Sequence, residues 1–215
     1  LMLYTSGTTG RPKGVPRSHR AERTAAASVI AHLRYQFGDS ALGVMPLFHT
    51  MGIRILLCSA MINGALINMR GFNAAEALQL IEKERINSLF LVPTMFHDLL
   101  AQESFAGTDV SFVRNVAYAG MSMTSELERR CVEQLKPEIF ANYYGSSEIF
   151  TFSVCDHLDK KPGAAGWPGI NQMIRVVRAD ADGKASPDEI RAPNEIGEII
   201  ATMQSPEAFS GYWRR

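Results

Sequence analysis

The feature that most constrains this chain is a turn rich in glycine and hydroxyl residues near its start. Residues 4–14 read YTSGTTGRPKG, between an apolar run at 1–3 and a segment that reads as a helix. Glycine has no Cβ and tolerates φ > 0, so the backbone N–H groups of such a turn can approach a ligand closely. N–H groups clustered near a helix start bind anions, and Ser, Thr and Lys side chains add donors and charge. We therefore expect a strand-to-helix turn that binds a polyphosphate.

Two familiar phosphate loops do not fit this stretch. A Walker loop has Ser or Thr after its lysine, whereas Gly14 follows Lys13 here. The G-x-G-x-x-G spacing of dinucleotide-binding folds is also missing from the stretch. A solvated loop of glycine and threonine is the alternative interpretation, and the rest of the chain has to decide between the two.

Composition and charge argue against several classes of protein. With 46% hydrophobic residues among 215, the chain can bury a sizeable core and is not expected to be disordered. Lys+Arg and Asp+Glu number 22 each, a balance that gives no reason to propose nucleic acid as a partner. Cys58, Cys131 and Cys155 form no C-x-x-C pair, so we expect neither disulfides nor a zinc site, and the simplest location is cytoplasmic. The longest apolar stretch, 53–67, is interrupted by Arg54, so no membrane span is expected.

Strand-like and helix-like segments alternate through the first 163 residues. Short apolar runs are typical of buried strands, and apolar residues at three- to four-residue spacing are typical of helices. Expected strands cover 42–45, 65–69, 88–92, 113–119 and 138–142, and expected helices cover 18–35, 51–62, a segment from Asn73, 93–102 and a segment from Thr124. This alternation predicts an α/β fold with a mostly parallel sheet flanked by helices. Residues 164–215 read as short strands instead, which predicts the start of a small β-rich subdomain.

The ends of the expected strands carry candidate site residues. Ligands of such sheets bind beyond the carboxyl ends of the strands. Thr5, Pro46, Gly120 and Asn142 each lie at or just after such an end. We therefore expect the residues around them to converge on one edge of the sheet.

Two further motifs lie at these strand ends. Residues 142–148 read NYYGSSE, in which an aromatic ring can stack on a flat base and Glu148 is a suitable ligand for Mg²⁺. Taken alone, these residues are also ordinary turn chemistry. Residues 46–52 read PLFHTMG and place His49 at a strand end, although a lone histidine beside apolar residues is more often part of a core. The remaining histidines are expected to be structural or solvent-facing: His19, His32, His97 and His157.

In order and spacing, the three motifs resemble those of the adenylate-forming enzymes, and residues 197–199 (GEI) and 211–212 (GY) match a fourth motif of that superfamily. Through residues 46–49 and 78–89 the chain is most similar to acid–CoA ligases of the 4-chlorobenzoate type. The resemblance implies a two-step reaction in which a carboxylic acid and ATP form an acyl-adenylate, which the thiol of coenzyme A then attacks. It implies Mg²⁺ as cofactor and residues 1–163 as the nucleotide- and acid-binding core.

The resemblance also implies roles for individual residues. The β- and γ-phosphates would be held by Thr5, Ser6, Gly7, Thr8, Thr9, Gly10 and Lys13. Adenine would lie between Tyr144 and the segment Ala119, Gly120 and Met121, with Asn142 and Tyr143 beside it. Ser147 would hydrogen-bond the α-phosphate, and Glu148 would ligate Mg²⁺. The acid pocket would be lined by His49, Thr50, Met51, Phe96, Gly145, Ile149 and Phe150. The catalytic residues would be Lys13, His49 and Glu148.

Some features depart from the superfamily pattern. Ser147 stands where threonine is usual, and residues 120–122 lack the usual proline. No acidic residue lies near His49 to pair with a substrate ammonium, which favours a simple carboxylic acid over an amino acid. The chain stops after Arg215 without an end signal, so we expect the central part of a longer protein, with the ribose-binding Asp and the C-terminal catalytic lysine of the superfamily beyond it. The alternatives are an adenylation domain that delivers to a carrier protein and a non-catalytic nucleotide-binding fragment.

Overall fold

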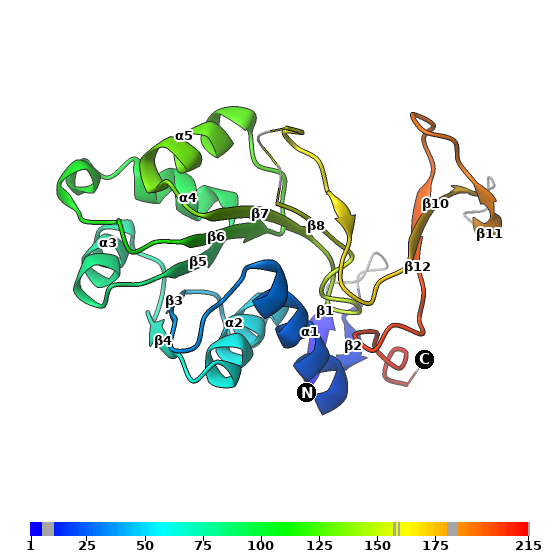
Figure 1. Cartoon of the computed structure of the whole chain (residues 1–215). Coiled ribbons are helices and arrows are strands. Elements are labelled where there is room, and N and C mark those ends of the chain that lie inside the picture. The colour runs from blue at the N-terminus through cyan, green and yellow to red at the C-terminus, as the bar shows by residue number, and fades with distance from the viewer. Residues whose placement is uncertain (6–10, 157, 159, 180–184, 215) are drawn as a thin grey trace.

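A seven-stranded sheet forms the centre of the protein (Figure 1). The computed structural model describes residues 1–5, 11–156, 158, 160–179 and 185–214. Along the sheet the order is β4-β3-β5-β6-β7-β8-β9, with the first five strands parallel and β8 and β9 antiparallel. The strands are β3 (Ser40–Gly43), β4 (Ala65–Asn68), β5 (Ser88–Leu91), β6 (Asn115–Ala119), β7 (Ile139–Tyr144), β8 (Ser153–Cys155) and β9 (Trp167–Pro168). The prediction of a mostly parallel α/β sheet is confirmed.

Helices cover both faces of this sheet (Figure 1). One face carries α1 (His19–His32) and α2 (Thr50–Met61), and the other carries α3 (Ala74–Lys83), α4 (Pro93–Leu100) and α5 (Ser125–Leu135). Successive side chains of a strand point to opposite faces, so Leu89 and Leu91 of β5 pack with α3–α5 while Phe90 packs with α1 and α2. A short 3₁₀ helix, η1 (Glu103–Gly107), follows α4.

Local sequence explains where the helices begin. The side chains of Ser18, Asn73 and Thr124 each accept a hydrogen bond from the backbone N–H three residues on, at 3.1, 2.9 and 3.3 Å. Such N-caps satisfy donors that the first helical turn leaves without a partner. Pro93 opens α4, where its missing N–H costs no helical hydrogen bond. None of the helices in the described part of the chain is long and apolar enough to cross a membrane.

The start of the chain differs from the prediction. Met2–Thr5 (β1) pairs antiparallel with Lys13–Pro16 (β2) in a separate two-stranded sheet, with Thr5 opposite Lys13. The expected strand-to-helix turn is therefore wrong, because a second strand precedes α1. Gly14 and Pro16 made this strand read as part of a turn, although its Val15 is fully buried. Residues 6–10 lie outside the described residues.

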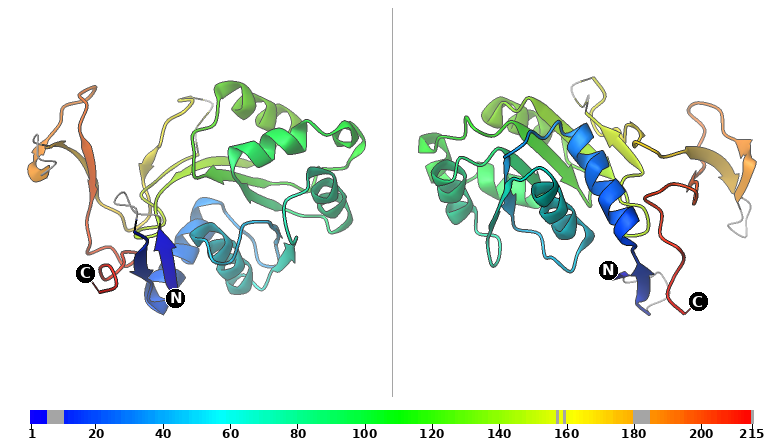
Figure 2. Two further views of the ribbon diagram at one scale, coloured as in Figure 1. Left: turned by 180° about the vertical axis from the view of Figure 1, so that it is seen from behind. Right: turned by 60° about the horizontal axis from the view of Figure 1, so that its bottom comes forward.

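A third sheet, three-stranded and antiparallel, follows the central one. Its order is β11-β10-β12, formed by Ala185–Ile190, Ile174–Ala179 and Glu198–Ala201. Figure 2 shows from two sides that this sheet stands apart from the helices. The central sheet continues to Pro168, a few residues past the expected boundary at 163. After β12 the chain returns to the β1–β2 hairpin, where the backbone N–H of Trp213 donates to Gly14 O at 2.9 Å.

Candidate active site

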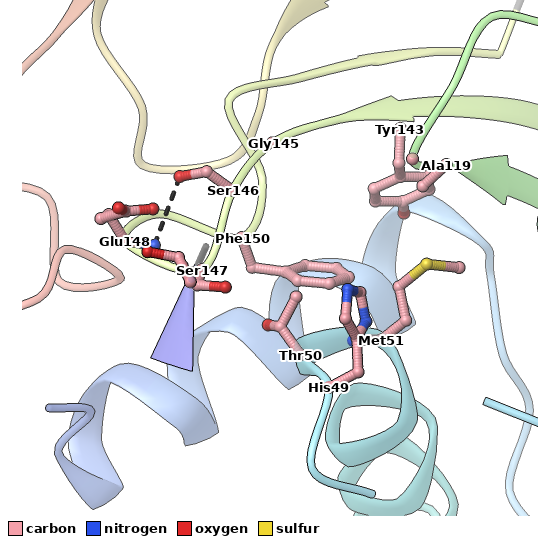
Figure 3. A pocket seen from close by; sticks show the side chains of 12 residues that line it. His49, Thr50, Met51, Ala119, Tyr143, Gly145, Ser146, Ser147, Glu148 and Phe150 are labelled. Carbon is pink, nitrogen blue, oxygen red and sulfur yellow. Dashed lines mark hydrogen bonds between the residues drawn. The ribbon is translucent and has the colours of Figure 1, made fainter. Parts of the chain in front are cut away.

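A cavity of about 370 Å³ lies between the carboxyl ends of β6 and β7 and the start of α2 (Figure 3). It is lined by Thr5, His49, Thr50, Met51, Ala119, Gly120, Tyr143, Gly145, Ser146, Ser147, Glu148 and Phe150. Eleven of these twelve residues are sequence-predicted site residues, which the fold brings together from β1, the start of α2, the end of β6, β7 and the segment after β7. We call this space the acid cavity.

A second cavity of about 370 Å³ adjoins the first and shares Gly120, Tyr143 and Gly145 with it. We call it the base cavity. Its other lining residues are Met121, Ser122, Asn142, Tyr144, Gly163, Ala165 and Ile199. Tyr144 is 46% exposed and its ring centroid lies 5.9 Å from that of Phe152, so the aromatic ring lines this cavity where a flat ring can stack on it. Asn142 lies within β7, not at its end, and its amide donates to the backbone oxygen of Ala164 at 3.0 Å.

A tight turn after β7 holds the hydroxyl and carboxylate groups in place. Ser146 N donates to Ile149 O at 2.9 Å, and Ser146 Oγ accepts from Glu148 N at 3.3 Å. Ser146 is not among the predicted site residues, although serine is common in turns because its hydroxyl can bond the backbone two residues on. The turn leaves the side chains of Ser147 and Glu148 lining the acid cavity.

Gly145 is needed for the close approach of the backbone in this turn. A Cβ at residue 145 would lie 1.7 Å from the backbone oxygen of Phe150. We expect Gly145→Ala to destabilise the protein by about 1–3 kcal/mol or more, because a backbone clash cannot be relieved by moving a side chain. Gly107→Ala is the matched control, because no atom lies within 4 Å of the Cβ it would add. Urea unfolding of both variants tests this, and equal unfolding midpoints would contradict the close approach.

His49 caps α2. Its Nδ1 accepts a hydrogen bond from Met51 N at 3.2 Å, which assigns the proton of the neutral ring to Nε2. Partial removal of water from the imidazole lowers its pKa, so the ring is neutral near pH 7. His49 is exposed, whereas Thr50 and Met51 are buried. The neutral imidazole can therefore offer an N–H donor to a ligand in the acid cavity.

Two predicted wall residues of the acid pocket are placed elsewhere. Phe96 is fully buried and packs with α3–α5 on the opposite face of the sheet from α2. Ile149 is buried and is not among the described residues that line the cavity. The prediction was wrong for Phe96, because an apolar residue near a strand end does not reveal which face of the sheet it covers. The role of Ile149 stays a prediction.

The phosphate-loop residues are only partly described. Thr5 lines the acid cavity, and Lys13 lies on β2 with its ammonium 5.1 Å from the ring centroid of Tyr212. The predicted contacts of Ser6, Gly7, Thr8, Thr9 and Gly10 fall outside the described residues.

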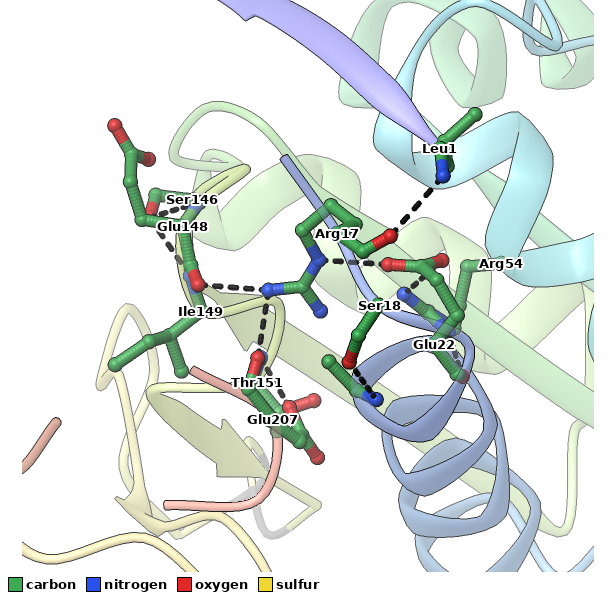
Figure 4. A network of polar contacts seen from close by, with 11 residues as sticks. Leu1, Arg17, Ser18, Glu22, Arg54, Ser146, Glu148, Ile149, Thr151 and Glu207 are labelled. Atoms are coloured by element: carbon green, nitrogen blue, oxygen red, sulfur yellow. Dashed lines mark hydrogen bonds and ion pairs between the residues drawn. The ribbon is translucent and has the colours of Figure 1, made fainter. Parts of the chain in front are cut away.

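A buried ionic cluster lies behind the acid cavity (Figure 4). Glu22 accepts from Arg17 Nε at 2.7 Å and from Arg54 Nη2 at 2.9 Å, and the side chains of both arginines are fully buried. The guanidinium of Arg54 lies 4.7 Å from the ring centroid of Phe150, a cavity residue. Arg17 Nη1 donates to the backbone oxygen of Glu148 at 2.7 Å, so the cluster also supports the turn. Sequence reasoning missed this cluster.

Glu207 completes the surroundings of the cluster. Its side chain is buried, and its Oε2 accepts from Thr151 N at 3.2 Å. Its backbone oxygen accepts from Arg17 Nη1 at 2.6 Å. Burial raises the pKa of the Glu207 carboxyl. The C-terminal segment is thus anchored beside the turn that carries Glu148.

The donor set suits a metal ion that is shared with a ligand. Within the described residues, no group of three or more His, Cys, Asp or Glu side chains could hold a metal ion. The Glu148 carboxylate and the Ser147 hydroxyl nevertheless lie together at the acid cavity. Mg²⁺ is usually held by one or two carboxylates together with phosphate oxygens of a substrate, so these residues fit it.

Comparison with known proteins agrees with this geometry. The family model described as AMP-binding enzyme matches residues 1–213. A 4-chlorobenzoate–CoA ligase of Pseudomonas sp. (strain CBS-3) is 33% identical over 185 residues, which cover 85% of this chain and 35% of the relative. A feruloyl-CoA synthase of Amycolatopsis sp is 29% identical over 219 residues, which cover 100% of this chain and 42% of the relative.

The fold is also similar to that of solved structures. The luciferase-like enzyme of the mealworm Zophobas morio superposes with a TM-score of 0.87 at 26% identity, over 100% of this chain and 49% of that one. The chain spans 35% and 42% of the length of the two curated relatives named above.

Proposed function

Since this chain belongs to the AMP-binding enzyme family, we propose that its two adjoining cavities bind ATP and a carboxylic acid for an AMP-forming acid–CoA ligase. One observation carries this proposal. Ser147 and Glu148 line the acid cavity immediately after Tyr144 of the base cavity. A nucleotide with its base on Tyr144 therefore has its phosphates at the hydroxyl and the carboxylate, next to the acid.

The nucleotide is positioned by residues of both cavities. The adenine ring stacks on Tyr144 in the base cavity, beside Gly120 and Met121. The Ser147 hydroxyl donates to the α-phosphate, and Glu148 would hold Mg²⁺, which would supply positive charge against that of the phosphates. Lys13 and Thr5, on either side of residues 6–10, bind the β- and γ-phosphates. Asn142 and Tyr143 support the base from β7.

The acid is positioned from the α2 side. Met51, Tyr143 and Phe150 give the acid cavity an apolar wall, which suits the body of an aryl or alkyl acid. The Nε2–H of His49 can donate to the carboxylate, and this holds it near the α-phosphorus. Holding two reactants in one site removes much of the entropic cost of their reaction.

The chemistry then has two steps. A carboxylate oxygen attacks the α-phosphorus, and the bond to the leaving pyrophosphate breaks, which gives the acyl-adenylate. The thiolate of coenzyme A attacks the acyl carbon, and the C–O bond to AMP breaks, which gives the thioester. Both curated relatives named above are CoA ligases or synthases, which supports coenzyme A over a carrier protein as the acceptor.

Isotope exchange in the full-length protein tests the first step. Labelled pyrophosphate should enter ATP only when Mg²⁺ and a suitable aryl or alkyl acid are both present. No exchange with any acid of a broad panel would refute the proposal. For the second step, the acyl thioester should form with coenzyme A; formation only with a phosphopantetheinylated carrier protein would show the alternative adenylation function.

A further inference from the structure

We propose that Tyr212 is a positioning residue that orients the Glu148 carboxylate for Mg²⁺–ATP and ties it to Lys13 of the phosphate loop. The inference rests on the proposed function, because it takes Glu148 as the metal ligand. Tyr212 belongs to the GY motif of residues 211–212.

The C-terminal segment holds Glu148 at both ends. The Tyr212 hydroxyl donates to Glu148 Oε1 at 2.8 Å, and Phe209 N donates to the backbone oxygen of Glu148 at 3.0 Å. A hydrogen bond to a charged carboxylate is stronger than one between neutral groups. Because the hydroxyl donates to Oε1, it fixes the orientation of the carboxylate that the proposed function assigns to the metal ion.

The same segment reaches the phosphate-loop lysine. The Lys13 ammonium lies 5.1 Å from the ring centroid of Tyr212, a distance at which a cation is attracted to an aromatic face. Trp213 N donates to Gly14 O at 2.9 Å and so joins the segment to β2. The Phe209 ring meets the Tyr212 ring edge-on, with centroids 4.9 Å apart, and steadies it.

Tyr212 therefore connects two charged groups that belong to different parts of the fold. Lys13 lies on the β1–β2 hairpin, and Glu148 lies beyond β7 of the central sheet. A glutamate side chain has several rotatable bonds, and ordering it on binding costs free energy. A hydroxyl that already holds the carboxylate in place reduces that cost, as does a ring that already holds the ammonium.

Tyr212→Phe separates the two contacts, because it removes the hydroxyl and keeps the ring. The experiment is equilibrium binding of a fluorescent ATP analogue to the full-length protein, with Mg²⁺ titrated and with EDTA. We expect the Mg²⁺ concentration at half-saturation to rise about three- to tenfold, the size of effect usual for one lost hydrogen bond. The affinity for the analogue in EDTA should be unchanged, because Lys13 keeps its aromatic neighbour.

Tyr212→Leu and a double mutant complete the test. Tyr212→Leu removes the ring as well, so it should also lower the affinity in EDTA. The effects of Tyr212→Phe and Glu148→Gln on Mg²⁺ dependence should not add in the double mutant, because both variants alter one hydrogen-bonded pair.

The outcomes distinguish this inference from the proposed function. If Glu148→Gln raises the Mg²⁺ concentration at half-saturation and Tyr212→Phe leaves it unchanged, the positioning role is refuted while the proposed function stands. If Tyr212→Phe weakens binding of the ATP analogue equally with and without Mg²⁺, its role is merely structural, and the positioning role is also refuted. If Glu148→Gln itself has no effect, the assignment of Glu148 as metal ligand fails, and the inference fails with it.

Discussion

Glu22→Gln should lower the free energy of unfolding by about 3–5 kcal/mol, because it removes the charged carboxylate that contacts both buried guanidinium groups. Glu22 is the carboxylate between Arg17 and Arg54, at 2.7 and 2.9 Å. Taking one partner out of a buried ion pair costs far more than the pair contributes when intact, because the remaining charge stays away from water. Urea unfolding followed by circular dichroism measures the change.

The matched control is Glu133→Gln on the surface of α5. Glu133 pairs with Arg129 at 2.6 Å, a distance as short as those in the buried cluster, but both side chains are more than half exposed. Exposed ion pairs contribute little to stability, so the unfolding midpoint of this variant should stay close to that of the wild type. Equal shifts for the two variants would contradict the role of the buried cluster.

The second large effect is expected at Glu148. Glu148→Gln keeps the size of the side chain and an oxygen that can accept from Tyr212, but it removes the charge that Mg²⁺ prefers. We expect Mg²⁺-dependent ATP binding to weaken at least about tenfold, or about 1.4 kcal/mol, while the unfolding midpoint stays nearly unchanged. Calorimetric titration of ATP with and without Mg²⁺ measures this.

Glu103→Gln on η1 is the control for loss of a negative charge. Its side chain is exposed on a 3₁₀ helix and lines neither cavity, so ATP binding should match the wild type. Wild-type affinity of Glu148→Gln for ATP in the presence of Mg²⁺ would refute its assignment as a metal ligand.

Much of the fold could be predicted because its strands are short buried runs. All four residues of β5 are buried, so the apolar run at 88–92 carried a strong signal. Several smaller strands were missed, β2, β8 and β9 among them. β2 contains Gly14 and Pro16, and β8 and β9 have only three and two residues, so tertiary pairing decides their conformation, not local preference. The family resemblance drawn from the motifs is confirmed by the match over residues 1–213.

The candidate site could be predicted where its residues follow strands. Residues 143–148 and 49–51 lie at the edge where the parallel strands end, as such sheets require. Phe96 was misplaced because hydrophobicity alone does not tell a cavity wall from a core. The ionic cluster was missed because most of its contacts join residues far apart in sequence: only Arg17 and Glu22 are near each other, whereas Arg54 lies 32 residues from Glu22 and Arg17 lies 190 residues from Glu207. No local pattern brings such partners together.

The most direct test of the central claim follows the oxygen atoms of the acid. The full-length protein is given ATP, Mg²⁺, coenzyme A and a carboxylic acid that carries ¹⁸O in its carboxylate. If the carboxylate attacks the α-phosphorus in the site between His49 and Ser147, one labelled oxygen must leave with AMP when the thiol displaces it. Mass spectrometry of the nucleotide product should therefore show AMP with one ¹⁸O. Unlabelled AMP, or ADP as the product, would contradict the proposed reaction.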